Sequence, residues 1–413
     1  MHRYGRHSEC REQEDAPSLQ NCLRSIEDSP SEFHRAGYLQ MITYHVLSET
    51  EPFSEPNGGA IARWAGNVLR DDDASVILAP SADDSWAFPR HRIKTSERLL
   101  SYARKPGGLT RHLPWPIHRR FLRWALSALR PLLKQGDNVW VHNRPEFAAT
   151  LQPIIRGAGA RLFLHMHNSH FSDCAAPIAA AIDADQHVFV SRFLEAEARQ
   201  VRPSMRRSAV LYNGADGAVF HPPAHRTDGP VRILCVARLV HNKGIHVFLE
   251  AMRLLAERGV DARGIVLGTA NFGNDTDAET RYVRKLKSDA PANVEFVPYT
   301  FGTALAEEFR AADIFCCPSI WEEPFGMVNV EAMATGLPVV ATRMGGIPEI
   351  FENGGALLVP ANDAEAIAQA MQRLIANPEE RRKMGDAGLR SFQRRFSWGA
   401  VRETYDKLIV EDI

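Results

Sequence analysis

The chain has 413 residues, of which 45% are hydrophobic and 24% charged, and its formal net charge is -1. This length predicts two domains, because one hydrophobic core rarely organises so many residues. The near-neutral charge argues against a general attraction to nucleic acid or anionic membranes and leaves only local patches for such contacts. No apolar stretch approaches the ~20 residues that span a bilayer, and the polar first residues argue against a secretory signal.

The cysteines indicate the redox state of the cellular compartment in which the protein resides. There are six, none of them in a CxxC motif, and Cys235, Cys316 and Cys317 lie within apolar runs. Reduced, buried thiols are typical of proteins that stay in a reducing compartment. We therefore expect a cytoplasmic protein without disulfides.

The first half of the chain is expected to consist of an arm followed by a domain. Residues 1–36 are rich in charge, serine and proline, which predicts a poorly ordered arm. Residues 37–220 alternate strand-like and helical patterns, which predicts a parallel sheet covered by helices. Expected strands span residues 38–44, 75–78, 138–141, 161–166, 187–190 and 209–212, and an expected helix spans 60–70.

A linker and a second alternating series follow. Residues 221–230 contain two adjacent prolines and an Asp-Gly-Pro sequence, which indicates a linker. Residues 231–396 are expected to form a second doubly wound domain, with strands at 232–236, 264–267, 294–297, 314–317, 339–341 and 356–359. The fold class is therefore α/β, with two Rossmann-like domains. Ligands of such sheets bind at the carboxyl ends of the strands, so the cleft between the halves is the expected site.

The most informative motif runs from residue 319 to residue 331. Pro324 and Gly326 predict a tight turn after a strand, and a helix that begins near Met327 would offer free N–H groups to an anion. Glu323 lies before this helix and Glu331 about one turn inside it. A carboxylate can accept hydrogen bonds from two vicinal hydroxyls, as found on sugars and riboses. Alternatively, the two glutamates are an ordinary helix-start acid and a solvated surface residue.

A second motif places two cations in one loop. Arg238 and Lys243 follow a strand and precede a helix that begins after Gly244. Two cations at the carboxyl edge of a sheet could neutralise a diphosphate, the arginine through its planar fork and the lysine as a point charge. The alternative is a surface loop with two ordinary cations.

Taken in order, these motifs resemble the retaining glycosyltransferases of family 4, which have the two-domain GT-B architecture. The resemblance runs from about residue 39 to the C-terminus. It implies that residues 397–413 form a helix that completes the first domain. The matching elements are the Gly58-Gly59 loop, Arg238, Lys243, Glu323, Glu331 and the segments 212–216, 345–349 and 396–398. The loop at 268–273 departs from the family's compact turn, so no contact is carried over there.

The resemblance implies a role for each residue. Glu323 would hold sugar hydroxyls beside the backbone N–H groups of Phe325, Gly326 and Met327, and Glu331 would hold the ribose. Arg238 and Lys243 would stabilise charge on the departing diphosphate. The backbone of Gly58 and Gly59 would approach the same phosphates from the other domain.

Several histidines lie near strand ends in the first half. His165 and His167 are two residues apart and share one face of a strand, and His142 and His170 lie at comparable positions. Three or four histidines could bind a metal. The resemblance instead places one histidine against the transferred sugar, and His167 fits that position. We therefore expect no metal, and His165 could be a buried structural residue.

Residues 89–130 are locally basic and contain interleaved aromatic residues. Such a surface could contact anionic lipid headgroups or an anionic acceptor. The alternative is a solvated basic helix whose Ile117, Phe121, Trp124 and Leu129 pack on the sheet.

These features predict a retaining, metal-independent hexosyl- or N-acetylhexosaminyltransferase. It would use a nucleotide-diphosphate sugar as co-substrate, without a cofactor, and a glycan or lipid-linked acceptor, in cell-surface polysaccharide or lipopolysaccharide synthesis. It would be cytoplasmic, with peripheral contact to the inner face of the membrane through residues 89–130. The alternatives are a nucleotide-sugar epimerase, a glycan phosphorylase or a non-catalytic nucleotide-sugar binding protein. A dinucleotide dehydrogenase is disfavoured because neither half opens with GxGxxG.

Overall fold

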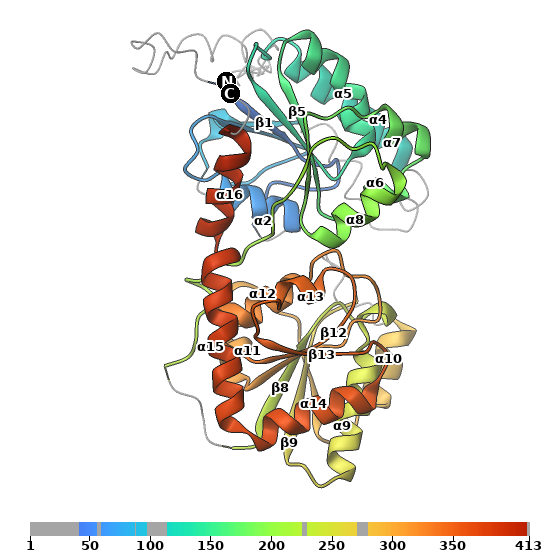
Figure 1. The fold of residues 1–413 in the computed structure, drawn as a ribbon, viewed down its shortest axis with the longest axis vertical. Helices are drawn as coiled ribbons and strands as arrows, with labels where there is room; N and C mark the ends of the chain where they lie inside the picture. The colour runs from blue at the N-terminus through green and yellow to red at the C-terminus, as the bar shows by residue number, and fades with distance from the viewer. Residues whose placement is uncertain are drawn as a thin grey trace, which may run out of the picture. The chain divides into compact units, whose positions relative to one another are not determined.

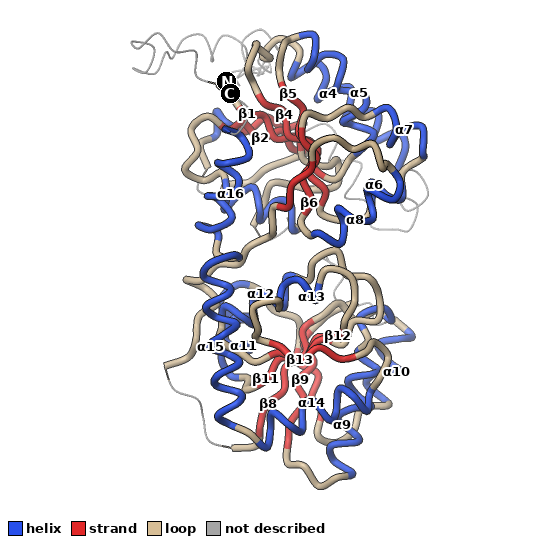
Figure 2. Tube along the Cα trace, in the orientation of Figure 1, coloured by secondary structure: helices blue, strands red, loops and turns tan. Residues whose placement is uncertain are grey.

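The computed structural model describes residues 41–55, 59–86, 88–96, 114–224, 229–270 and 280–410. The expected arm at residues 1–36 and Gly58 lie outside the described residues. Two parallel sheets, each with helices packed against it, make up the described fold (Figures 1 and 2).

The first sheet has seven strands in the order β3-β2-β1-β4-β5-β6-β7, all paired in parallel. Its strands are β1 (Thr43–Val46), β2 (Ser75–Ala79), β3 (Ile93–Thr95), β4 (Asn138–His142), β5 (Arg161–Met166), β6 (Gln186–Phe189) and β7 (Ser208–Val210). Its helical segments are α2 (Ala60–Val68), η2 (Arg90–Arg92), α4 (Pro114–Leu129), α5 (Pro145–Gly157), α6 (His170–Asp173), α7 (Ala176–Ala181) and α8 (Arg192–Val201). The strand order reverses direction between β1 and β4, the position at which doubly wound sheets bind ligands.

The second sheet has six strands in the order β10-β9-β8-β11-β12-β13, again all parallel. Its strands are β8 (Val231–Val236), β9 (Ala262–Leu267), β10 (Val294–Val297), β11 (Ile314–Cys317), β12 (Val339–Thr342) and β13 (Ala356–Val359). Its helical segments are η5 (His241–Lys243), α9 (Ile245–Glu257), α10 (Arg281–Ser288), α11 (Gly302–Ala311), α12 (Met327–Ala334), α13 (Ile347–Ile350), α14 (Ala364–Ala376) and α15 (Pro378–Arg395).

The last helix, α16 (Trp398–Val410), packs on α2 of the first half. The guanidinium of Arg402 donates to the carbonyl of Val68 (2.9 Å), and Arg161 of β5 donates to the carbonyl of Ile409 (2.8 Å). Figure 1 shows α16 beside α2, although the two helices lie at opposite ends of the chain. The end of the chain is therefore part of the first half's structure.

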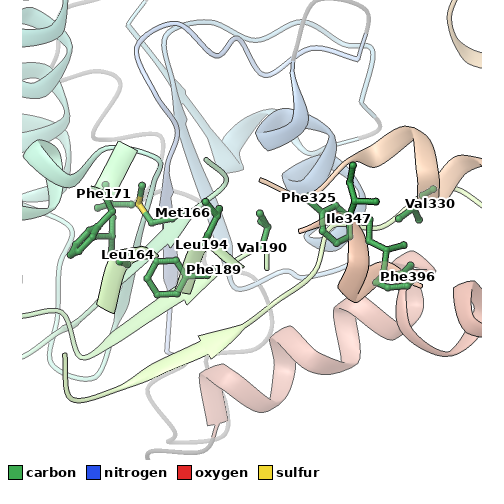
Figure 3. Close-up of a cluster of buried hydrophobic side chains, with 14 of the residues drawn as sticks. Leu164, Met166, Phe171, Phe189, Val190, Leu194, Phe325, Val330, Ile347 and Phe396 are labelled. Carbon is green, nitrogen blue, oxygen red and sulfur yellow. The ribbon is translucent and has the colours of Figure 1, made fainter. Parts of the chain in front are cut away.

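Buried side chains form three clusters. One contains residues of α2, β4 and α16, including Trp64, Trp140 and Tyr405, and covers one face of the first sheet. Another lies between the second sheet and helices α9 and α14. The largest contains residues of both halves, and Figure 3 shows part of it, with Leu164 and Phe325 among the labelled side chains.

Local signals explain several helix starts. Ser191 accepts a hydrogen bond from the N–H of Leu194 at the start of α8 (3.1 Å), and Asp363 does the same for Ala366 in α14 (2.9 Å). Such side-chain caps satisfy N–H groups that a helix leaves without a partner. Helix α5 begins with Pro145, whose missing N–H is harmless at that position.

The structure corrects two strand predictions. The first described strand is Thr43–Val46, whereas the expected strand spans residues 38–44, of which residues 38–40 lie outside the described residues. The strand continues to Val46 because the polar His45 is buried within it. The edge strand β3 was not predicted, because three residues with partly exposed side chains carry no buried apolar run.

Cys235, Cys316 and Cys317 are buried free thiols, and Cys174 is also free. Among the described residues, no helix is long and apolar enough to cross a membrane.

Candidate active site

An ion pair connects the two predicted motifs of the second half. The Nζ atom of Lys243 lies 2.5 Å from Oε1 of Glu323, and the hydroxyl of Ser319 donates to the same oxygen (2.9 Å). Glu323 and Ser319 are buried, and Lys243 also lies over the ring of Trp321, 5.0 Å from its centroid. The structure therefore brings together a cation and a carboxylate that are 80 residues apart.

Two glycines allow this close approach. Gly244 has φ +70°, and a Cβ there would lie 1.9 Å from the carbonyl oxygen of Pro318. Gly345 has φ +55°, and a Cβ there would lie 2.3 Å from the carbonyl oxygen of Glu323. Only glycine tolerates both the left-handed backbone and the contact. The Lys243 loop and the loop after β12 can therefore both pack against the loop that carries Glu323.

Helix α12 begins directly after this loop, as the sequence predicts. Gly326 precedes it with φ +101°, and no side chain caps the helix and no acidic residue lies in its first turn. Phe325 is buried, whereas Gly326 and Met327 are partly exposed. An uncapped helix start favours a negatively charged group, so the backbone at Phe325, Gly326 and Met327 is suited to an anion.

Glu331 lies inside α12 with only 5% of its surface exposed. Its carboxylate forms no hydrogen bond or ion pair with another described residue. Burial raises the pKa of Glu331, and the field of Arg63 in α2 opposes that rise. A buried carboxylate without a partner is costly, which is typical of a group reserved for a ligand.

Arg238 lies in the loop between β8 and η5, and its side chain is exposed. It belongs to the same loop as Lys243. The charge at this loop therefore consists of one exposed cation and one cation paired with Glu323.

In the first half, Gly59 precedes α2 and is exposed. A carboxylate already occupies this helix start, because Glu51 accepts a hydrogen bond from the N–H of Ala62 (3.1 Å) and bonds to the backbone of Gly59 and Ile61. Burial raises the pKa of Glu51, and these backbone hydrogen bonds oppose the rise. The expected phosphate contact at Gly59 would therefore share its donors with Glu51.

His167 follows β5 directly and is 9% exposed. Its backbone N–H donates to Oδ1 of Asn143 (2.8 Å), and its Nε2 is hydrogen-bonded to Nδ1 of His142 (3.2 Å). Burial lowers the pKa of His167 to about 3, which keeps the ring neutral. His165 is also buried and neither of its ring nitrogens has a hydrogen-bond partner among the described residues.

The other histidine at this edge belongs to a separate polar group. His170 Nδ1 lies 3.1 Å from the carbonyl oxygen of Asn143 and 3.2 Å from Nη1 of Arg144. Arg144 donates two hydrogen bonds to the carboxylate of Glu49 (2.8 and 2.9 Å). Burial acts to raise the pKa of Glu49, but hydrogen bonds from His118 and Arg144 outweigh it and lower that pKa to about 2.

The two halves are connected by Glu349 of helix α13, within the segment 345–349 that resembles the family. Its carboxylate accepts hydrogen bonds from the N–H groups of Arg192 (2.9 Å) and Phe193 (3.2 Å) at the start of α8, and from the hydroxyl of Tyr212 (3.2 Å). These contacts join the segments that follow β6 and β12. Residues at the carboxyl ends of both sheets are therefore held together.

Sequence reasoning did not single out Ser319, Glu51 or Arg63. Ser319 was visible as the first residue of the glutamate motif, but nothing in its spacing indicated a hydrogen bond to Glu323. Glu51 lies eight residues before Gly59, and Arg63 lies in the first turn of α2. A charged residue beside a glycine loop was the available signal for both.

The basic stretch at 89–130 is only partly described. Arg119, Arg120 and Arg123 are exposed on α4, whose Phe121 and Leu129 are buried. This agrees with a solvated helix packed on the sheet. Arg92 does not belong to an exposed basic surface. It is buried and donates to the carbonyl oxygens of Ser75, Leu69 and Asp72.

Comparison with known proteins identifies the family. The family model "Glycosyl transferases group 1" matches residues 220–390. A GDP-mannose-dependent alpha-(1-6)-phosphatidylinositol monomannoside mannosyltransferase of Mycolicibacterium smegmatis is 30% identical over 376 residues, which cover 83% of this chain and 92% of that protein. Spore coat protein SA of Bacillus subtilis is 27% identical over 298 residues, covering 65% of this chain and 76% of that protein.

Solved structures show the same fold. Sucrose-phosphate synthase from Thermosynechococcus elongatus superimposes with a TM-score of 0.69 at 21% identity, covering 90% of this chain and 98% of that chain. Anabaena Alr3699/HepE in complex with UDP and glucose gives a TM-score of 0.66 at 18% identity, covering 90% and 100%.

The protein therefore has the GT-B fold, and it belongs to a class of enzymes that transfer glycosyl groups. The chain belongs to the group 1 glycosyltransferases, and the resemblance to family 4 is confirmed.

Proposed function

We propose that this enzyme transfers a hexosyl or N-acetylhexosaminyl group from a nucleotide-diphosphate sugar with retention of anomeric configuration. The observation that carries the proposal is the Lys243–Glu323 pair beside the uncapped start of α12. It combines a cation for the leaving diphosphate, a carboxylate for the sugar hydroxyls and a backbone site for negative charge.

In this proposal the second half binds the donor. Glu331 accepts hydrogen bonds from the ribose hydroxyls, because its buried carboxylate has no partner among the described residues. Glu323 accepts hydrogen bonds from the sugar, and its ion pair with Lys243 fixes the position of both side chains. Pre-set polar groups of this kind stabilise charge that develops in the transition state.

Charge on the departing diphosphate is the part of the reaction that the cations stabilise. Lys243 lies at the site, paired with Glu323, and Arg238 is exposed in the same loop. The backbone before α2 adds N–H groups from the first half, beside Gly59. His167 stays neutral and hydrogen-bonds to a sugar hydroxyl.

The direct test is turnover with a panel of UDP, GDP and ADP sugars, selected first by thermal shift. A ligand present at ~100 times its dissociation constant stabilises a protein by ~2.7 kcal/mol. The anomeric configuration of the product is then read by NMR. An inverted product would contradict retention, and a stabilising sugar that is hydrolysed or isomerised but never transferred would contradict a transferase.

We also propose that the reaction needs no metal. Lys243 and Arg238 supply the positive charge that a divalent ion would otherwise bring to the diphosphate. Activity is expected to survive EDTA unchanged. Loss of activity in EDTA that is restored by a divalent ion would overturn this proposal.

The acceptor is proposed to be a glycan or lipid-linked molecule in cell-surface polysaccharide or lipopolysaccharide synthesis. The exposed Arg119, Arg120 and Arg123 on α4 support contact with an anionic acceptor or membrane surface. Co-sedimentation with anionic vesicles at low salt, lost when all three are replaced by Gln, tests this contact. Equal binding to neutral vesicles would contradict it.

A further inference from the structure

A polar cavity of about 630 Å³ lies in the first half, at the amino ends of β6 and β7. Its lining residues come from the end of α5, from β6, from the end of α8 and from the segments that precede β6 and β7. Because the strands of this sheet are parallel, these amino ends lie at the edge away from His167, which follows β5. Helix α8 has ten residues between its contact with Glu349 and the cavity, a length of about 15 Å. The cavity is therefore separate from the candidate active site.

Most of the charged residues that line the cavity are basic. They are Asp183, Asp185, Arg156, Arg202, Arg206 and Arg207. Both aspartates already have partners, because Asp183 pairs with Arg156 (2.7 Å) and Asp185 accepts a hydrogen bond from the N–H of Leu162 (2.7 Å). The arginines outnumber the aspartates, so the cavity carries net positive charge and favours an anion.

Two side chains of the cavity wall each contain a buried nitrogen that has no hydrogen-bond partner among the described residues. These atoms are Nε of Arg202 and Nε2 of His187. The guanidinium of Arg202 donates through Nη1 to the carbonyl of Ala179 (3.1 Å) and forms no ion pair with another described residue. Buried polar atoms without partners are costly, so each of them calls for an explanation.

The hydrogen bonding of His187 shows which kind of partner its Nε2 atom lacks. His187 is 2% exposed, and its Nδ1 lies 3.3 Å from the carbonyl oxygen of Arg207, which can only accept. Burial, assisted by the charge of Arg202, lowers the pKa of His187 to about 4, so the ring is neutral at pH 7. A neutral ring with its proton on Nδ1 has a lone pair on Nε2. The cavity wall therefore lacks an acceptor for Arg202 and a donor for His187.

We propose that this cavity binds a phosphate monoester that also carries hydroxyl groups, such as a sugar phosphate. Arg202, together with the exposed Arg206 and Arg207, binds the phosphate oxygens, for which the planar guanidinium is well suited. A hydroxyl of the ligand donates to Nε2 of His187. The volume of the cavity is that of a small-molecule site. The proposal does not depend on the proposed function, because none of these residues belongs to the donor site.

Ordinary cations at helix ends are the competing explanation. Arg156 lies in the last turn of α5 and Arg202 directly follows α8, where positive charge is favourable without any ligand. This explanation does not cover Arg206 and Arg207, which belong to no helix, and it leaves Nε2 of His187 without a donor. The two explanations differ in whether a phosphate monoester binds.

Calorimetric titration of the full chain with glucose 6-phosphate, glucose 1-phosphate and glycerol 3-phosphate tests the site. At least one of them is expected to bind with a Kd of about 1 mM or tighter. Glucose lacks the phosphate and sulfate lacks the hydroxyls, so both should bind about tenfold more weakly. Failure of all three monoesters to bind would overturn the proposal, as would binding only to vesicles of phosphatidic acid, which present the same group on a lipid.

Substitutions of the arginines locate the bound phosphate. Arg202→Gln is expected to raise the Kd about tenfold, and Arg206→Gln about threefold because solvent screens an exposed charge. Arg382→Gln is the matched control, since it removes the same charge from an exposed pair with Asp386 on α15. Unchanged affinity in both cavity variants, or an equal loss in the control, would overturn the proposal. The exposed Arg206 keeps this test valid if Arg202→Gln does not fold.

Methyl phosphate, a monoester without hydroxyls, tests the role of His187. It should bind the wild-type protein more weakly than the best of the three hydroxylated monoesters. His187→Leu keeps a similar side-chain volume and removes the acceptor, so it should abolish this difference while leaving the affinity for methyl phosphate unchanged. Equal wild-type affinity for methyl phosphate and the hydroxylated monoesters would overturn the assignment of His187.

Competition separates the cavity from the donor site. The nucleoside diphosphate that stabilises the protein in the thermal-shift screen should leave the Kd of the monoester unchanged, and so should Lys243→Ala. Displacement by the diphosphate, or loss of binding in Lys243→Ala, would place the monoester at the donor site and overturn the proposal. An enzyme that is inactive with every nucleotide sugar but binds a monoester through Arg202 would contradict the proposed function alone.

Discussion

Lys243 and Glu323 are hydrogen-bonded to each other at 2.5 Å. Lys243 is expected to contact the diphosphate and Glu323 the sugar. The charges of these two residues are therefore coupled through their ion pair. Replacing either one changes the environment of the other, whereas Arg238 is exposed and lies outside this pair.

Lys243→Ala is expected to lower both kcat and stability. Loss of one contact to developing charge typically raises the barrier by ~2.7–4 kcal/mol. The variant also leaves the buried Glu323 without its counter-ion, so its melting temperature should fall. Arg238→Ala should also lower kcat. Arg258→Ala, which removes a surface pair with Glu365, is the control and should retain full activity. Near-wild-type turnover in both Lys243→Ala and Arg238→Ala would refute the assignment.

The two glutamates should differ in which kinetic constant they affect. A sugar contact strengthens as the ring gains positive charge, whereas a ribose contact is equal in the ground and transition states. Glu323→Gln should therefore mainly lower kcat. Glu331→Gln should mainly raise the donor KM and weaken binding of the free nucleoside diphosphate, by ~1.5–3 kcal/mol for a hydrogen bond to a charged group. Calorimetric titration with the diphosphate measures the second effect, and the reverse pattern would mean that the roles are exchanged.

Most strands were predictable because strands buried on both faces of a parallel sheet are short apolar runs. The run at 161–166 coincides with β5, whereas β1 was misplaced because His45 interrupts its apolar pattern. The order of motifs along the chain was likewise sufficient for the family.

Contacts between distant residues were not predictable. The pairing of Lys243 with Glu323 spans 80 residues, and that of His45 with Tyr405 spans 360. The two-residue spacing of His165 and His167 predicted a shared face. It held no information about His45, which reaches that face from another strand.

Stability should fall as the pH decreases below about 6.5. Burial, assisted by the neighbouring His167, His142 and His45, lowers the pKa of His165 far below its value in the unfolded chain. The unfolded state therefore binds a proton that the folded state does not, and each such histidine contributes up to ~1.4 kcal/mol per pH unit. His165→Leu should reduce the slope of the free energy of unfolding against pH by the contribution of one bound proton. Urea unfolding at pH 7, 6 and 5 measures the slope, and an equal slope in the variant would contradict a neutral buried His165.

Glu51→Gln should strengthen binding of the nucleoside diphosphate about threefold. The Glu51 carboxylate takes up N–H groups at the start of α2, where a phosphate would also bind, and a charge at a helix start is worth ~0.3–1 kcal/mol. Glu55→Gln removes an exposed charge from the same loop and serves as the control. Unchanged or weaker binding in Glu51→Gln would show that this helix start does not meet the phosphates.

The return of α16 to the first half affects how the protein is made. Tyr405 and Val401 fill the space beside Trp64 and Trp140, and these two residues are translated after the whole second half. Until then the aromatic face of the first sheet, with the His45 ring, stays open to water or to a chaperone. We therefore expect the second half to fold while the first is still incomplete, although the first is translated earlier.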